Sequence, residues 1–146
     1  MRRFFRRPGA KLEPAPEKRL VFTILVAGAK ASYDGALEDF LGAGGHLILR
    51  AESAEEALAQ TRRHQPDLIL LDGELGEQGG LRLLGRLFLE QASAAVILMS
   101  GHPSVAESVE AMRRGAADYL GRPLDLERLK QAIGIQKLLF KPGANP

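Results

Sequence analysis

Short apolar segments alternate with longer amphipathic segments from residue 21 to residue 140. The clearest apolar segment is residues 67–72, DLILLD, in which four apolar residues stand between two aspartates. A run this short and this apolar is typical of a parallel strand buried on both faces. The amphipathic segments instead repeat their apolar positions every three or four residues, as helices with one buried face do.

The pattern predicts strands at residues 22–27, 46–50, 67–72, 94–99 and 117–120. It predicts helices at residues 32–41, 53–64, 81–90, 104–114 and 125–139. Ser53 with Glu56, and Ser104 with Glu107, have the spacing of a capping box, and Asp125 is expected to cap the last helix. Five strand–helix units joined by short connections predict one α/β domain with a doubly wound, five-stranded parallel sheet.

Charge divides the chain into an arm, a domain and a short tail. Residues 1–20 carry seven Lys or Arg and two Glu, whereas the rest carries 13 basic and 16 acidic residues. The overall net charge of +2 therefore conceals a basic arm and a mildly acidic remainder. Three of the eight prolines also fall in residues 1–20, which we expect to be flexible, while residues 21–140 form the domain and residues 141–146 a tail.

Composition excludes several classes of function. The chain has no cysteine, so disulfides, thiolate catalysis and thiolate metal sites are excluded. No apolar stretch approaches the roughly 18 residues that a membrane span needs. No signal-peptide pattern follows the basic N-terminus, and we expect a cytoplasmic protein.

Asp72 is the residue for which a function is the first interpretation. It ends the most apolar strand, so it is expected in the crevice at the carboxyl ends of the strands, where open α/β sheets bind their ligands. A carboxylate at such a buried position costs free energy unless a partner compensates its charge.

Four sequence features occur in a fixed order: Pro66-Asp67 with the apolar run to Asp72, Gly80 eight residues later, Ser100 after residues 96–99, and Gly115-Ala116-Ala117-Asp118-Tyr119-Leu120 followed by Arg122-Pro123. Together they resemble the receiver domain of bacterial two-component response regulators over about residues 21–140. Residues 101–104 and the helix after them look most like receivers of the enhancer-binding activator class. The resemblance implies a flavodoxin-like (βα)5 fold, with Asp72 at the phosphoacceptor position and Ser100 and Tyr119 as switch residues.

Such a receiver holds a divalent cation between the phosphoacceptor and two carboxylates at the end of the first strand. Phosphoryl transfer to a carboxylate accumulates negative charge, which Mg²⁺ and a cationic side chain offset. In this chain Gly28 and Ala29 stand where the resemblance places the acidic pair, and neither has a ligating side chain. We therefore expect a degenerate receiver with no metal and no other cofactor.

Two further departures concern charge and flexibility near Asp72. Arg122 replaces the family's lysine, and a planar, bidentate guanidinium differs from a compact ammonium. Gly76 replaces the usual loop proline and makes that loop more pliable. We expect Arg122, at the end of an adjacent strand, to pair with Asp72 in place of the metal, with Lys30 as a second candidate cation.

Other residues allow further chemistry as well as simpler interpretations. Glu74 could supply a replacement metal ligand or be a solvated loop carboxylate. Gly28 suggests a dinucleotide loop, but two of the three fingerprint glycines are missing. Ser100 as a nucleophile would need a base that the sequence does not indicate. The histidines, His46, His64 and His102, show no ligand spacing.

The sequence thus predicts a binding module, not an enzyme: a single-domain receiver that contacts a protein partner, or a second copy, without phosphorylation. The contact surface implied by the resemblance comprises residues 105–114, 117–120 and 126–139. The alternative is a receiver that a histidine kinase phosphorylates on Asp72. A weaker suggestion is that residues 1–19, with Arg2-Arg3-Phe4-Phe5-Arg6-Arg7, contact nucleic acid or an anionic membrane; a solvated tail is the simpler interpretation.

Overall fold

The computed structural model describes residues 4–5, 13–14, 21–29 and 35–140. Its centre is a parallel sheet with strand order β4-β3-β5-β6-β7. The strands are β3 (Thr23–Ala27), β4 (Leu47–Ala51), β5 (Leu68–Asp72), β6 (Ala95–Ser100) and β7 (Asp118–Gly121). The predicted five-stranded, doubly wound sheet is confirmed, with each strand within one residue or so of its expected bounds.

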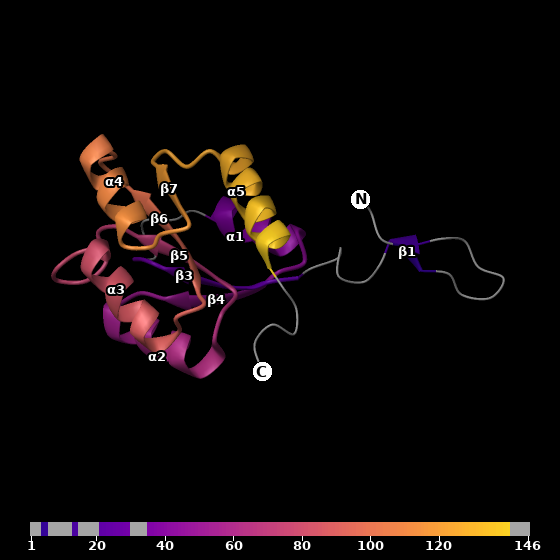
Figure 1. The fold of residues 1–146 in the computed structure, drawn as a ribbon, viewed down its shortest axis with the longest axis horizontal. Coiled ribbons are helices and arrows are strands. Elements are labelled where there is room, and N and C mark those ends of the chain that lie inside the picture. Colours follow the sequence, from indigo (N-terminus) through magenta and orange to yellow (C-terminus); the bar gives the residue numbers. More distant parts are fainter. Residues whose placement is uncertain (1–3, 6–12, 15–20, 30–34, 141–146) are drawn as a thin grey trace.

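Helices cover both faces of this sheet (Figure 1). They are α1 (Gly35–Ala43), α2 (Ala54–His64), α3 (Gly80–Glu90), α4 (Val105–Arg113) and α5 (Leu126–Leu139). The helix predicted at residues 32–41 is observed from Gly35, and residues 32–34 lie outside the described part. None of the helices in the described ranges is long and apolar enough to cross a membrane.

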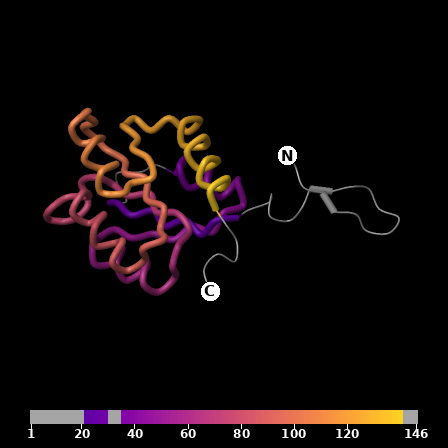
Figure 2. The backbone as a smooth tube through the Cα atoms, viewed as in Figure 1, coloured from indigo at the N-terminus to yellow at the C-terminus, as the bar shows by residue number. Residues whose placement is uncertain are grey.

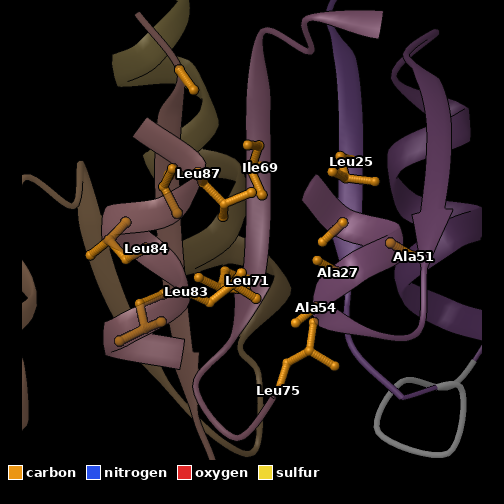
Figure 3. Packing of buried hydrophobic residues seen from close by; sticks show 14 of the residues in the cluster. Leu25, Ala27, Ala51, Ala54, Ile69, Leu71, Leu75, Leu83, Leu84 and Leu87 are labelled. Atoms are coloured by element: carbon orange, nitrogen blue, oxygen red, sulfur yellow. The ribbon is translucent and has the colours of Figure 1, made fainter. Parts of the chain in front are cut away.

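Alternating side chains of the central strand divide the core into two clusters. In β5, Ile69 and Leu71 face α2 and α3, where Leu83, Leu84 and Leu87 are buried (Figure 3). Leu68 and Leu70 join the opposite cluster, which α1 and α5 cover. All five residues of β5 are buried, as expected for a strand with a helix layer on each face.

Side-chain caps fix where three helices begin. The Ser53 and Ser104 hydroxyls accept hydrogen bonds from the N–H groups of Glu56 and Glu107, and Asp125 caps α5. The reciprocal half of the capping box is not made at Ser104, because the Ser104 N–H donates instead to the Tyr119 hydroxyl at 3.3 Å. The capping pattern therefore predicted the helix starts but not the partner of the Ser104 N–H.

The apolar faces of two helices can be compared with the sequence pattern. In α3 the pattern places Leu81, Leu84 and Phe88 on one face; Leu84 is buried, Leu81 and Phe88 pack partly buried against the same cluster, and Leu83 and Leu87 are buried with them. In α5 the pattern continues the apolar stripe from Leu129 and Ile133 to Leu138 or Leu139, with more apolar residues at the end than one buried stripe holds; Leu138 and Leu139 are 86% and 65% exposed. The stripe of α5 ends at Ile133, and the last turn of the helix presents apolar side chains outward.

Within the arm, the structure describes only β1 (Phe4–Phe5) and β2 (Glu13–Pro14), which pair antiparallel. The other residues of the predicted flexible arm, and the predicted tail at 141–146, lie outside the described ranges.

Candidate functional site

Asp72 lies at the carboxyl end of the central strand and is 3% exposed. Its Oδ1 accepts a hydrogen bond from the Glu74 N–H at 3.0 Å, and its backbone carbonyl accepts one from the Leu75 N–H at 3.1 Å. The loop after β5 therefore turns back tightly over the strand end. Gly80 permits this turn, because a Cβ at Gly80 would lie 2.7 Å from the Gly73 Cα.

The second carboxylate oxygen of Asp72 faces a guanidinium. Arg122 Nη2 lies 3.2 Å from Asp72 Oδ2, and the two side chains are 24% and 5% exposed. Arg122 follows β7, whose neighbour is β6 and not β5, so the expectation that it ends a strand adjacent to Asp72 was wrong by one strand. Its backbone N–H is fixed by the Ser100 carbonyl at 2.8 Å, and its long side chain reaches across the end of β6.

The end of β3 lies beside Asp72 but offers it no carboxylate. Ala27 pairs with Leu71 in the register of β3 and β5, which places Gly28 next to Asp72. Gly28 is buried and donates its N–H to the Ala51 carbonyl at 2.9 Å, and Ala29 is exposed. Lys30, the second candidate cation, lies outside the described residues.

These residues do not fit a bound Mg²⁺. Such an ion needs several hard oxygen ligands in near-octahedral geometry. At Asp72 one oxygen accepts the Glu74 N–H and the other faces Arg122, while the Glu74 carboxylate lies 3.8 Å from His102 Nε2 at the surface. Across the described ranges there is no group of three or more His, Cys, Asp or Glu side chains able to hold a metal.

Ser100 and Tyr119 are brought together with the start of α4. Ser100 ends β6, is 4% exposed, and its Oγ accepts the His102 N–H at 3.2 Å. The Tyr119 hydroxyl donates to the Glu107 carboxylate and accepts the Ser104 N–H. Tyr119 is partly buried and packs against the core cluster of α2 and α3, while its hydroxyl is held at the N-terminus of α4.

This environment favours the neutral tyrosine. Burial, and then the hydrogen bond donated to Glu107, raise the pKa of Tyr119 above its ordinary value of 10.0, against opposing hydrogen bonds from Ser100 and the Ser104 backbone. The phenol therefore remains a donor over the whole physiological pH range.

Strand β7 is also fixed to α5. Arg128 Nη2 donates to both carboxylate oxygens of Asp118, at 2.9 and 3.0 Å. The α4, β7 and α5 elements thus form one connected surface, to which α4 contributes an apolar stripe at Val105, Val109 and Met112, 82%, 50% and 48% exposed.

Sequence reasoning missed two of these contacts. The sequence assigns Glu107 only a capping-box spacing, whereas in the structure its carboxylate accepts a hydrogen bond from the Tyr119 hydroxyl. In the sequence Asp118 is only one member of the strand motif, whereas in the structure it pairs with Arg128. An acidic residue ten positions before an arginine carries no signal by itself, so only the fold reveals this pair.

The sequence of this chain is similar to those of known response regulators. The family model for the response regulator receiver domain matches residues 24–134. Curated relatives include the transcriptional regulatory protein ZraR of Salmonella typhimurium, 34% identical over 75% of this chain and 25% of that protein. Another is the response regulator protein FleR of Pseudomonas aeruginosa, 36% identical over 75% of this chain and 23% of that protein. The chain thus spans about a quarter of the length of these relatives.

Solved structures give the same assignment. The receiver domain of NtrX from Brucella abortus superposes with a TM-score of 0.73 at 28% identity, covering 80% of this chain and 99% of that one. The signal receiver domain of a putative LuxO repressor protein from Vibrio parahaemolyticus has a TM-score of 0.75 at 24% identity, which supports the fold alone. The family model matches residues 24–134, and the sheet order and the position of Asp72 agree with that match. This chain therefore belongs to the response regulator receiver domain family.

Proposed function

We propose that this receiver is degenerate and contacts a protein partner without phosphorylation of Asp72. The observation that carries the proposal is the ion pair between Arg122 Nη2 and Asp72 Oδ2 at 3.2 Å, formed where Gly28 and Ala29 leave no acidic pair. A guanidinium at this distance supplies the positive charge that the buried carboxylate requires. Asp72 is then compensated by the protein itself and needs no divalent cation.

The same ion pair opposes chemistry at Asp72. A phosphoryl group on Asp72 would have to displace the Arg122 guanidinium from the carboxylate or share it. Among the described residues at the end of β3, Gly28 and Ala29 offer no carboxylate to hold a metal against the incoming charge, and phosphoryl transfer depends on such charge neutralisation. We therefore assign Asp72 and Arg122 a structural role at the carboxyl end of the sheet.

The partner surface in this proposal is the α4, β7 and α5 face. Tyr119, Ser104 and Glu107 hold β7 to α4, and Asp118 with Arg128 holds β7 to α5. These contacts need no phosphoryl group, so the face is ordered without modification. Exposed apolar side chains on α4 supply the contact area that partner binding uses. The partner is another protein or a second copy of this chain.

Incubation with a small-molecule phosphodonor tests the proposal. The full chain is mixed with acetyl phosphate, with and without Mg²⁺, and its intact mass is measured at short intervals. We expect no phosphorylated species in either condition. A matched variant, Gly28→Asp/Ala29→Asp/Arg122→Lys, restores the acidic pair and the lysine that the resemblance implies. It is expected to gain Mg²⁺-dependent phosphorylation, provided that circular dichroism shows it folded.

The alternative function is phosphoacceptance from a histidine kinase. It is favoured by the joint retention of Asp72, Ser100 and a cationic residue at position 122. It predicts a phosphorylated species in the wild type that disappears in Asp72→Asn, and that outcome would overturn our proposal. Sedimentation velocity of the wild type and of Val109→Asp separates a homodimer from a monomer awaiting another partner.

A further inference from the structure

One end of the domain combines exposed apolar side chains with cations. It is the end at which the strands begin and the helices finish, since each helix runs back antiparallel to the strand before it (Figure 1). Asp72 lies at the opposite end of β5, so this surface is separate from the site described above. We call it the strand-start surface and define its apolar part as Val21, Leu47, Ile135, Leu138, Leu139 and Phe140.

Segments far apart in the sequence meet at this surface. The Phe140 ring, directly after α5, packs edge-on against Phe22 at a centroid distance of 5.6 Å. The Leu47 N–H donates to the Phe22 carbonyl at 2.9 Å, which joins the start of β4 to the start of β3. Figure 2 shows the yellow end of α5 where the indigo strand β3 begins. The end of α5 and the first residues of two strands therefore form one surface.

The apolar side chains of this surface point outward. Leu138 is 86% exposed, Leu139 65%, Leu47 60% and Val21 59%. Scattered exposed leucines need no explanation, but apolar side chains gathered on neighbouring elements mark an interaction surface. Phe22 beneath them is only 2% exposed, so these residues form a layer outside the core.

Basic residues also occur at this end of the domain. Basic residues occupy the last turn of three helices that finish at this end: Arg62, Arg63 and His64 of α2, Arg113 of α4, and Lys137 of α5. Arg62 is neutralised by Glu90 at 2.9 Å, and cations at helix C-termini also stabilise the helices themselves. The larger charge belongs to residues 1–20, with seven basic and two acidic residues, which join the domain directly at Val21.

We propose that the strand-start surface, together with the basic arm, docks on an anionic phospholipid membrane. Leucine side chains inserted at the headgroup boundary and cations over acidic lipids are the two contributions that hold peripheral proteins on such surfaces. In the sequence of the arm, Phe4 and Phe5 stand between two pairs of arginines, and aromatic side chains favour the membrane interface. Each cation near an anionic leaflet strengthens binding roughly fivefold at low salt.

Charge and chemistry favour this occupant over three others. Nucleic-acid phosphates would complement the cations but leave Leu138 and Leu139 in water. A second copy would bring two arms, each of net charge +5, close together. The chain's own arm has the same sign of charge as Lys137, beside which it would have to lie.

Vesicle co-sedimentation of the full chain tests the proposal. We expect binding to phosphatidylcholine vesicles that contain about one third phosphatidylserine and no binding to pure phosphatidylcholine vesicles. Binding to the anionic vesicles should weaken as added salt shortens the Debye length. Leu138→Ser/Leu139→Ser should weaken binding by about tenfold, because it removes two inserting side chains. Arg6→Gln/Arg7→Gln should weaken it by at least about tenfold, because it removes two cations.

Two control variants match these changes elsewhere on the domain. Val105→Ser alters an 82% exposed side chain at the start of α4, which lies at the opposite end. Arg82→Gln/Arg86→Gln removes two exposed cations from α3. Both should leave vesicle binding within about twofold of the wild type, since neither alters the strand-start surface or the arm.

Three outcomes would overturn the proposal. The first is no binding to anionic vesicles at low salt. The second is tighter binding to a DNA duplex of arbitrary sequence, unaffected by Leu138→Ser/Leu139→Ser, which would assign the arm to nucleic acid. The third is a wild-type dimer in sedimentation velocity that the leucine variant dissociates without changing vesicle binding, which would assign the surface to a second copy.

Discussion

Replacing Arg122 with alanine removes the counter-charge of a buried carboxylate. Asp72 has a 5% exposed side chain and lies 3.2 Å from Arg122 Nη2, a separation at which the attraction is about 5 kcal/mol at an effective dielectric constant near 20. The guanidinium is itself 24% exposed, so water entering from its side offsets part of the loss. From the cost of leaving a buried charge unpaired we expect Arg122→Ala to lower the free energy of unfolding by about 2–3 kcal/mol.

Urea denaturation followed by circular dichroism measures this change, together with a thermal midpoint lowered by about 6–12 °C. Asp72→Asn should cost less than about 1 kcal/mol, since Asn keeps the acceptor for the Glu74 N–H and leaves an arginine that reaches water. The double variant should recover most of the loss, giving a coupling energy of about 1.5–2 kcal/mol. Arg128→Ala breaks the more exposed pair with Asp118 and should cost no more than about 1 kcal/mol.

The reasoning is refuted if Arg122→Ala unfolds within about 0.5 kcal/mol of the wild type, or if the losses of the two single variants simply add. Either result would mean that the ion pair does not stabilise Asp72 and that the proposed structural role is wrong.

Three further predictions follow from other contacts. Gly80→Ala should destabilise by about 1–3 kcal/mol, because its Cβ would meet backbone atoms at 2.7–2.9 Å, whereas Gly85→Ala, with nothing within 4 Å in the same helix, should be neutral or stabilising in urea titrations. Tyr119 has a folded-state pKa raised by burial and by Glu107, so it stabilises the fold below pH 10.0, and that stability is lost as pH rises through the raised pKa. The chain has two tyrosines, so in Tyr33→Phe an ultraviolet titration follows Tyr119 alone and should show this late ionisation, which Glu107→Gln should move to lower pH. Burial and then Lys137 lower the pKa of His46 below 6.5, and its Nδ1 accepts a hydrogen bond from the Phe22 N–H, so the free energy of unfolding should fall as pH drops below 6.5. In urea titrations between pH 7 and pH 5, His46→Gln should flatten this pH dependence. An unchanged slope would contradict the assignment.

The sheet could be predicted because its strands carry a strong local signal. The run ending at Asp72 has no polar position between its two aspartates, and only a strand covered on both faces accounts for that pattern. Parallel topology then brings the carboxyl ends of the strands together, which is why the sequence alone groups Asp72, Ser100 and Arg122. Ser53 and Ser104 likewise fixed the helix starts through their own hydrogen bonds.

The remaining features depend on side-chain packing between elements. In α3 the leucines at 81, 83, 84 and 87 allow more than one apolar face, and only packing against β5 selects Leu83, Leu84 and Leu87. Periodicity also cannot distinguish a buried stripe from one that faces outward, so only the structure shows that both Leu138 and Leu139 lie outside the core. The Tyr119–Glu107 contact depends on a rotamer that tertiary packing decides.

The central claim is that Arg122 compensates the charge of Asp72 in place of a metal ion and that Asp72 is not phosphorylated. An amide NMR titration tests this claim most directly, first with Mg²⁺ and then with beryllofluoride, a mimic of the phosphoryl group on aspartate. The account predicts no saturable shifts at Asp72, Ser100 or Tyr119 in the wild type. The Gly28→Asp/Ala29→Asp/Arg122→Lys variant, if folded, should show such shifts and serves as the positive control. Saturable wild-type shifts that spread from Asp72 to Tyr119 would contradict the account and establish a working phosphoacceptor.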